Sequence, residues 1–148
     1  MQAKQFWSFL ATMLVTGVVL AAHDFLRPLN VDLFAPEDNV PETCARFFSA
    51  TGWGNGAWNE NRPHELYVTQ MDFDCNVDVL YGFGGWDHDG SGEWLSLAGT
   101  IRGDKLLLAI DIYEADVFYL LSEDGESLSG RFESRDRTRI ATVRLTRL

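Results

Sequence analysis

The segment Gly82–Trp94, which reads GFGGWDHDGSGEW, concentrates the side chains of this sequence that can bind a ligand or carry out chemistry. It contains tryptophans, carboxylates, a histidine and several glycines, and it connects two segments that read as β-strands. A simple hairpin connection needs only about two to five residues and no such side chains. We therefore expect a site here, at which either the acids hold a cation or the tryptophan rings stack on a ligand.

The acidic part of this segment resembles the first half of a calcium-binding loop. Asp87, Asp89 and Ser91 supply oxygen atoms at alternate positions, and a glycine stands at the sixth position. The twelfth position holds Ala98 instead of a glutamate, and the segment follows a strand, so it is not an EF-hand. Two interpretations stay open: a site for Ca²⁺ or another hard cation, completed by Glu93, or a solvated Asp/Gly turn.

Aromatic side chains offer a second kind of site. Rings of this type stack on sugars or flat apolar ligands, and the N–H of tryptophan can also donate a hydrogen bond. The alternative is that the tryptophans only close the end of a small barrel, which we favour for Trp58. The residues expected to bind a ligand are Trp58, Trp86, Trp94, His88 and Tyr113.

Catalytic chemistry finds less support. His64 and His88 are both expected on loops near carboxylates, and zinc would need three or four such ligands in tetrahedral geometry, but their spacing does not single them out. Asp87 and Glu93 could act as acid and base on a glycoside only at a separation of about 5–10 Å. We therefore expect a non-catalytic protein without a cofactor, apart from the possible Ca²⁺. A small metal-assisted or cofactor-free enzyme is the less favoured alternative.

The first residues of the sequence and its cysteines point to export. Residues 1–22 read as a signal peptide, because Lys4 precedes the apolar run Phe6–Ala22 and small residues stand near its end. A retained N-terminal anchor is the alternative. Cys44 and Cys75 are expected to form one disulfide, which suits a periplasmic or secreted protein.

The net charge of −10 bears on the class of partner. A chain this acidic repels phosphate backbones and anionic lipid headgroups, which argues against nucleic-acid and membrane-surface binding. A small molecule or carbohydrate is the expected ligand. A protein partner that docks on the acidic loops is the alternative.

Apart from its first residues, the sequence predicts one all-β domain. Residues 23–40 read as an irregular arm, and a short helical segment begins at Pro41 and ends before Gly52. Apolar residues then alternate with polar ones in short runs, which indicates an antiparallel up-and-down barrel of about eight strands over residues 41–148. A two-sheet β-sandwich is the alternative. The expected strands are Trp53–Asn59, Glu65–Phe73, Cys75–Phe83, Trp94–Ile101, Leu106–Ile112, Val117–Leu121, Leu128–Glu133 and Ile140–Arg147.

The connections between these strands alternate between long and tight. In an up-and-down order every second connection lies at the same end of the barrel, so the long ones are expected to share one mouth. Binding residues usually lie on such loops. The long connections are expected at Glu60–His64, Gly84–Glu93, Tyr113–Asp116 and Ser134–Arg139.

The start of the first strand resembles that of the calycin-type barrels, the lipocalins and avidins. The resemblance rests on a short helix followed by Gly56-Ala57-Trp58 and the strand succession. In those families a basic side chain of the last strand packs on the tryptophan of a Gly-x-Trp motif. The resemblance implies that Arg144 or Arg147 takes this part and that the barrel is a ligand-holding cup, without identifying the ligand.

Overall fold

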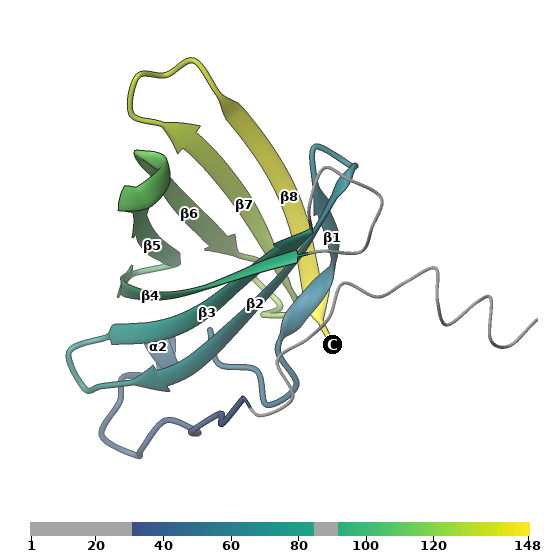
Figure 1. The fold of residues 1–148 in the computed structure, drawn as a ribbon. Helices are drawn as coiled ribbons and strands as arrows, with labels where there is room; N and C mark the ends of the chain where they lie inside the picture. The colour runs from purple at the N-terminus through teal and green to yellow at the C-terminus, as the bar shows by residue number, and fades with distance from the viewer. Residues whose placement is uncertain (1–30, 85–91) are drawn as a thin grey trace, which may run out of the picture.

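A computed structural model describes residues 31–84 and 92–148. Its strands form a closed antiparallel barrel in chain order, in which β8 also pairs with β1 (Figure 1). This confirms the predicted up-and-down barrel, and the two-sheet sandwich is not formed. A short helix, α2 (Glu42–Ala45), precedes the barrel. The strands are β1 (Trp53–Trp58), β2 (Arg62–Met71), β3 (Asn76–Gly84), β4 (Gly92–Arg102), β5 (Lys105–Ile110), β6 (Ala115–Leu121), β7 (Ser127–Ser134) and β8 (Ile140–Arg147).

The alternation of side chains along each strand builds the core. Successive residues of a strand point to opposite faces, so every second residue enters the barrel. On β3, for example, Val77, Val79, Tyr81 and Phe83 are all buried. Among the residues that the structure describes, no helix is long and apolar enough to cross a lipid bilayer.

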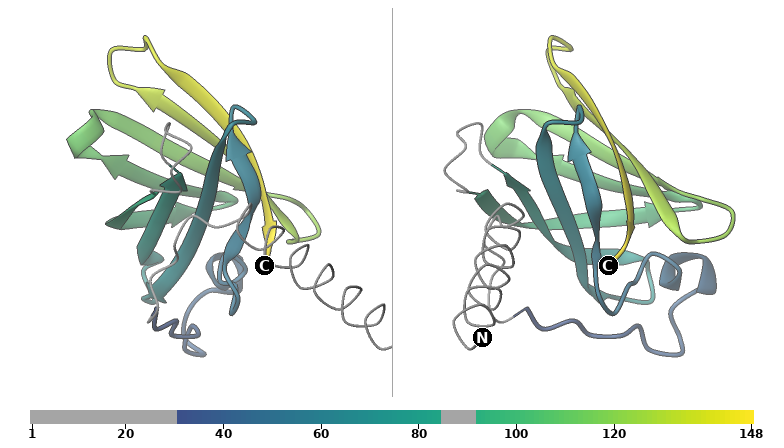
Figure 2. Two further views of the ribbon diagram at one scale, coloured as in Figure 1. Left: turned by 45° about the vertical axis from the view of Figure 1, so that its right-hand side comes forward. Right: turned by 90° about the vertical axis from the view of Figure 1, so that its right-hand side faces the viewer.

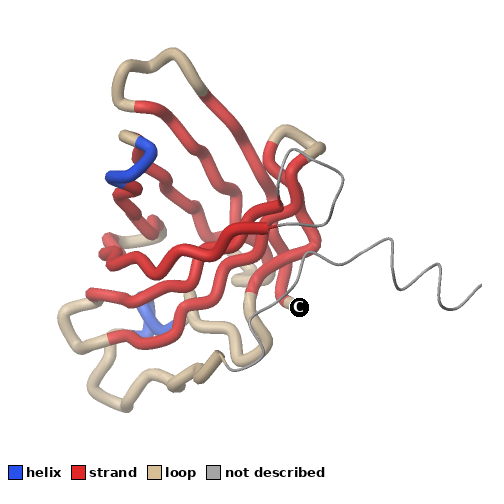
Figure 3. The backbone as a smooth tube through the Cα atoms, viewed as in Figure 1, coloured by secondary structure: helices blue, strands red, loops and turns tan. Residues whose placement is uncertain are grey.

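One end of the barrel is closed by α2 and by the last residue of β8. Figure 3 shows α2 at the opposite end of the barrel from the short 3-10 helix η1 (Asp111–Tyr113), which joins β5 to β6. The predicted disulfide is confirmed: Cys44 on α2 is bonded to Cys75 in the turn between β2 and β3. The bond fixes the helix beneath the barrel wall.

A contact between Arg147 and Trp53 completes this closed end. The guanidinium carbon of Arg147 lies 4.3 Å from the centre of the Trp53 ring, and that ring is fully buried. The resemblance implied that the basic residue of the last strand packs on Trp58. In the structure it packs on Trp53 instead. Trp58 is too far away for this contact, because it lies at the other end of β1 and a strand rises about 3.3 Å per residue.

The other end of the barrel is its mouth. The connections after β1, β5 and β7 share this end, as the chain order requires (Figure 2). Their lengths differ from the prediction, because β2 begins at Arg62 and leaves only Asn59–Asn61 as a turn. The turn between β2 and β3 spans residues 72–75 instead of Asp74 alone. The position of the mouth thus follows from strand order and not from loop length.

The pairing between β4 and β5 covers only one end of β4. β4 pairs with β3 over nearly its whole length, from Gly92 to Thr100, but with β5 only from Gly99 to Arg102. The first half of β4 therefore has no β5 partner, and Figure 1 shows the two strands diverging. Leu95 and Leu97 face inward here but are only partly buried.

Candidate functional site

A cavity of about 620 Å³ opens at the mouth of the barrel. Residues from β1, β2, β3, β4, β5, β7 and β8 form its walls, and described residues of the connections at the mouth form its rim. The lining residues are Trp58, Asn59, Asn61, Arg62, Tyr81, Phe83, Glu93, Ile110, Tyr113, Phe132, Thr138, Arg139, Ile140 and Ala141.

The walls of this cavity are mainly aromatic. The Trp58 ring centre lies 6.5 Å from that of Tyr81 and 6.3 Å from that of Phe132. Phe83 meets Tyr113 edge-on, with their ring centres 5.9 Å apart. These separations are typical of attractive aromatic pairs, so the rings hold one another in place. The result is a cavity walled by aromatic rings that pack against one another.

Charged groups stand at the rim. Arg62 donates from Nε to the carbonyl oxygen of Gly84 at 2.6 Å, and its guanidinium lies 4.5 Å from the centre of the Phe83 ring. Arg139 donates to the carbonyl oxygen of Tyr113 at 3.3 Å. The two arginines thus bring positive charge to the cavity of a protein whose net charge is −10.

Within the part of the chain that the structure describes, Glu93 is the single carboxylate that lines the cavity. It accepts a hydrogen bond from the Tyr113 hydroxyl, so β4 and η1 are joined where β4 has no β5 partner. The pKa of Tyr113 is raised, first by its partial burial and then by the hydrogen bond and negative charge of Glu93. The tyrosine is therefore a neutral donor to this carboxylate.

A buried polar group lies behind the aromatic wall. His64 is 1% exposed and contacts the rings of Trp58 and Tyr81, with ring centres 4.9 and 4.5 Å apart. Its Nδ1 is 2.6 Å from the carbonyl oxygen of Gly82, and its Nε2 is 2.7 Å from the Tyr119 hydroxyl. Burial lowers the pKa of His64 to about 3, against a smaller raising effect of the Gly82 hydrogen bond.

These contacts fix the tautomer of His64. A carbonyl oxygen can only accept, so Nδ1 carries the proton and donates to Gly82. Nε2 of the neutral ring is then an acceptor, and the Tyr119 hydroxyl donates to it. The expectation that His64 lies on a loop was wrong: it is an inward-facing residue of β2, because that strand begins two residues before it.

The polar atoms of Trp58 and Tyr81 are not satisfied in the same way. Among the side chains that the structure describes, Trp58 Nε1 is the one fully enclosed nitrogen or oxygen atom without a hydrogen-bond partner. The Trp58 ring centre lies 6.5 Å from that of Tyr81, and the indole N–H favours the charged form of the Tyr81 hydroxyl, which acts to lower the pKa of Tyr81. Burial has the larger effect and raises the pKa of Tyr81.

The residues expected to bind a ligand fall into three groups. Trp58 and Tyr113 line the cavity, as does Glu93, which was expected to help hold a cation. Trp94 lies on the outer face of β4, where it covers Gly82 and has its ring centre 6.0 Å from that of Tyr67. It does not line the cavity, because its neighbour Glu93 faces inward and strand side chains alternate. The remaining expected residues, Trp86, Asp87, His88, Asp89 and Ser91, lie outside the described residues.

The cation site therefore stays a prediction. Within residues 31–84 and 92–148, no group of three or more His, Cys, Asp or Glu side chains is arranged to hold a metal ion. The proposed ligands other than Glu93 all belong to the part of the chain that is not described.

Sequence reasoning missed three wall residues, Tyr81, Phe83 and Phe132, as parts of the site. Their inward direction was predicted from the alternation along β3 and β7. The missing information was their height along the barrel, since an inward residue lines the cavity only near the mouth. Counting positions from the mouth end of each strand would have found them.

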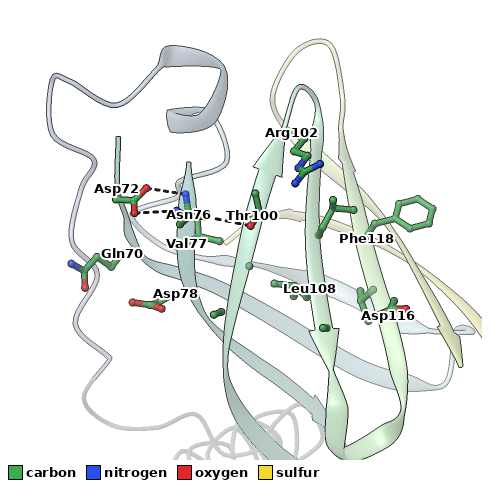
Figure 4. A pocket seen from close by; sticks show the side chains of 15 residues that line it. Gln70, Asp72, Asn76, Val77, Asp78, Thr100, Arg102, Leu108, Asp116 and Phe118 are labelled. Carbon is green, nitrogen blue, oxygen red and sulfur yellow. Dashed lines mark hydrogen bonds between the residues drawn. The ribbon is translucent and has the colours of Figure 1, made fainter. Parts of the chain in front are cut away.

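A second hollow, of about 690 Å³, lies on the outside of the barrel across β2 to β6. Figure 4 shows Asp72, Asp78 and Asp116 among its lining residues. Some of its polar groups are already paired with one another: the Asn76 backbone N–H donates to Asp72, and the Thr100 hydroxyl lies 3.4 Å from the Asn76 side-chain oxygen. The mouth cavity is lined by more aromatic side chains than this outer hollow, and we therefore take it as the candidate site.

Comparison of the chain with models of known protein families and with curated protein sequences found no match. The assignment of function therefore depends on the geometry of the cavity.

Proposed function

We propose that this protein is an exported, non-catalytic binding protein that holds a planar apolar or aromatic ligand in the mouth cavity. The observation that carries the proposal is a cavity of about 620 Å³ with aromatic walls. Sites for small molecules are typically about 300–1,000 Å³ in volume and are mainly apolar, with a few polar groups that fix orientation. Trp58, Tyr81 and Phe132 are the wall, and the arginines at the rim are the polar groups.

The state of His64 supports binding over catalysis. A general base must be within reach of its substrate and needs a pKa near the working pH. His64 is enclosed behind the wall, both of its ring nitrogens are hydrogen-bonded within the protein, and its pKa is about 3. It is a structural support for the rings of the cavity.

Export and the calycin resemblance are parts of the same proposal. The signal-peptide pattern of residues 1–22 supports export, as does the Cys44–Cys75 disulfide, since such bonds persist in oxidising compartments. The closed up-and-down barrel order supports a calycin-like origin, although Arg147 packs on Trp53 instead of on the Trp58 of the Gly-x-Trp motif. A calycin-like barrel would hold its ligand inside the open end.

The test is a ligand screen with a variant that fills the cavity. Ala141 lines the cavity, whereas its neighbour Thr142 is exposed on the outer face of β8. We expect some planar aromatic compounds to raise the melting temperature and change the tryptophan fluorescence of the wild type and of Thr142→Trp, but not of Ala141→Trp. A broad screen without any response from the wild type would reject the proposal, as would equal responses from both variants.

Docking of a protein partner is our alternative. The observation that favours it is the outer hollow, which is lined by Asp72, Asp78 and Asp116 and also by Leu107, an apolar side chain that is 39% exposed. A basic partner with an apolar contact residue would match this surface. In that case Asp78→Arg should abolish a complex isolated from the exported fraction, while Asp104→Arg, on the exposed β4–β5 turn, should leave it intact.

A further inference from the structure

We infer that the ligand of the mouth cavity carries a carboxylate, one oxygen of which accepts a hydrogen bond from the Tyr81 hydroxyl. The inference rests on the proposed function and names the chemical group that the site recognises. It also assigns to Tyr81 the role of orienting the ligand.

The first step of the argument is the position of the Tyr81 hydroxyl. The side chain is 3% exposed and its ring lines the cavity. Within the described residues this hydroxyl makes no hydrogen bond of normal geometry. If it were also fully enclosed, it would be a buried polar atom without a partner, but Trp58 Nε1 is the one described side-chain atom of that kind. The Tyr81 hydroxyl therefore touches the open space of the cavity.

The second step is the direction of its proton. The neighbouring Trp58 ring, with its centre 6.5 Å from that of Tyr81, offers only an N–H, which can donate but cannot accept the hydroxyl proton of Tyr81. That leaves the hydroxyl proton of Tyr81 to be donated to another group. Burial raises the pKa of Tyr81, so the proton is present at neutral pH and above. A buried donor without a partner is costly, and a ligand oxygen would satisfy it.

The third step is the charge of that oxygen. Arg62 and Arg139 line the same cavity, and the positive charge of Arg62 is close enough to lower the pKa of Tyr81 against the effect of burial. Among the described lining residues Glu93 is the one carboxylate, and it is hydrogen-bonded to Tyr113. An anionic acceptor is favoured in this field, and hydrogen bonds to charged groups are stronger than those between neutral groups. A ligand with a carboxylate on a flat ring would pack its ring against the aromatic walls and would bring its negative charge to the arginines at the rim.

The experiment compares three probes that share one ring system: 2-naphthoate, neutral 2-acetylnaphthalene and 2-methylnaphthalene, which lacks an oxygen acceptor. Calorimetric titration of the purified full-length protein gives the dissociation constant of each. The variants are Tyr81→Phe, which removes only the hydroxyl, and Arg139→Gln. The matched control is Arg137→Gln, on the same β7–β8 connection but with a side chain that is 85% exposed and outside the cavity.

The inference predicts a separate effect for each variant. Tyr81→Phe should weaken binding of 2-naphthoate by about tenfold and of 2-acetylnaphthalene by a smaller factor, with 2-methylnaphthalene within twofold of wild type. Arg139→Gln should weaken binding of 2-naphthoate alone, by roughly threefold to tenfold. Arg137→Gln should change none of the three.

Two results would overturn the inference, and they differ in what they leave standing. If all three probes bind and neither Tyr81→Phe nor Arg139→Gln alters their relative affinities, the carboxylate is wrong and the proposed binding function survives. If none of the probes binds and the wider screen is also silent, both fail. Because Arg139 is exposed, its variant keeps the test decisive even where Tyr81→Phe is too unstable to measure.

Discussion

The Arg147 guanidinium stacks on the Trp53 indole at 4.3 Å, and these two residues are also direct backbone partners at the seam where β8 closes on β1. Arg147 further donates hydrogen bonds to the carbonyl oxygens of Phe48, Arg46 and Gly125. One side chain thus joins the last strand to the segment after α2 and to the β6–β7 turn. Its loss should affect the closure of the whole barrel.

We predict that Arg147→Gln lowers the free energy of unfolding by about 2–4 kcal/mol. The change removes a cation–π contact, and it takes the charged donor away from backbone carbonyl groups, some of which are partly buried. Urea denaturation followed by tryptophan fluorescence measures the difference. Arg144→Gln is the control, because Arg144 is exposed on the same strand and its loss should cost less than about 0.5 kcal/mol. Equal effects of the two changes would contradict this role of Arg147.

Gly56 should not tolerate a side chain. A Cβ atom at this position would lie 2.0 Å from the backbone carbonyl oxygen of Arg144 on β8. Gly56→Ala is therefore expected to destabilise the barrel by about 1–3 kcal/mol, or to shift the β1–β8 contact. Ala57→Ser, at the adjacent and partly exposed position, is expected to be nearly neutral. Thermal denaturation of both proteins checks the prediction, and a stable Gly56→Ala protein would refute it.

The disulfide should be a major source of stability. Cys44 and Cys75 are 31 residues apart, and closing a loop of this length removes entropy from the unfolded chain equivalent to about 3–4 kcal/mol. Cys44→Ala/Cys75→Ala is expected to lose a comparable amount in urea denaturation. Reduced wild-type protein should unfold at the same urea concentration as this double variant. Identical curves for oxidised wild type and double variant would show that the bond contributes nothing.

His64 should make the barrel sensitive to moderate acid. Its pKa is lowered from 6.5 to about 3 by burial, so between these values the unfolded chain binds a proton that the folded protein excludes. The free energy of unfolding therefore falls as the pH drops below about 6.5, by about 2 kcal/mol between pH 7 and pH 5.

The control for this pH dependence is His64→Gln. We expect the variant to be less stable at pH 7, because it disturbs the bonds to Gly82 and Tyr119. Its stability should nevertheless change much less between pH 7 and pH 5. Parallel stability curves for the two proteins would show that His64 is not the titrating group.

The fold was predictable because its determinants are local. The alternation Val77, Val79, Tyr81 and Phe83 on β3 marks one buried face, and short turns leave neighbouring strands little choice but to pair in order. The site was less predictable, since strand ends shift by a few residues and a shift of that size decides what lines a cavity. His64 moved from an expected loop into a strand for this reason.

Trp94 shows the same dependence on register. Its aromatic character suggested a place at the mouth, but pairing with Gly82 sends it outward and sends Glu93 inward. A single residue of register reverses the face of every side chain on a strand. The hydrophobic period and the composition of a strand therefore do not decide which face a side chain takes; the residue that it pairs with on the next strand does.

The sequence by itself determined an acidic all-β chain with one disulfide and with its mouth at the ends of alternate strands, because periodicity, charge and cysteine count are local or additive properties. Only the tertiary structure decided that Arg147 packs on Trp53, that His64 is buried and neutral, and that Tyr81 lines the same cavity as Arg62 and Arg139. These relationships join residues far apart in the chain, and barrel closure with its exact register is what brings them together.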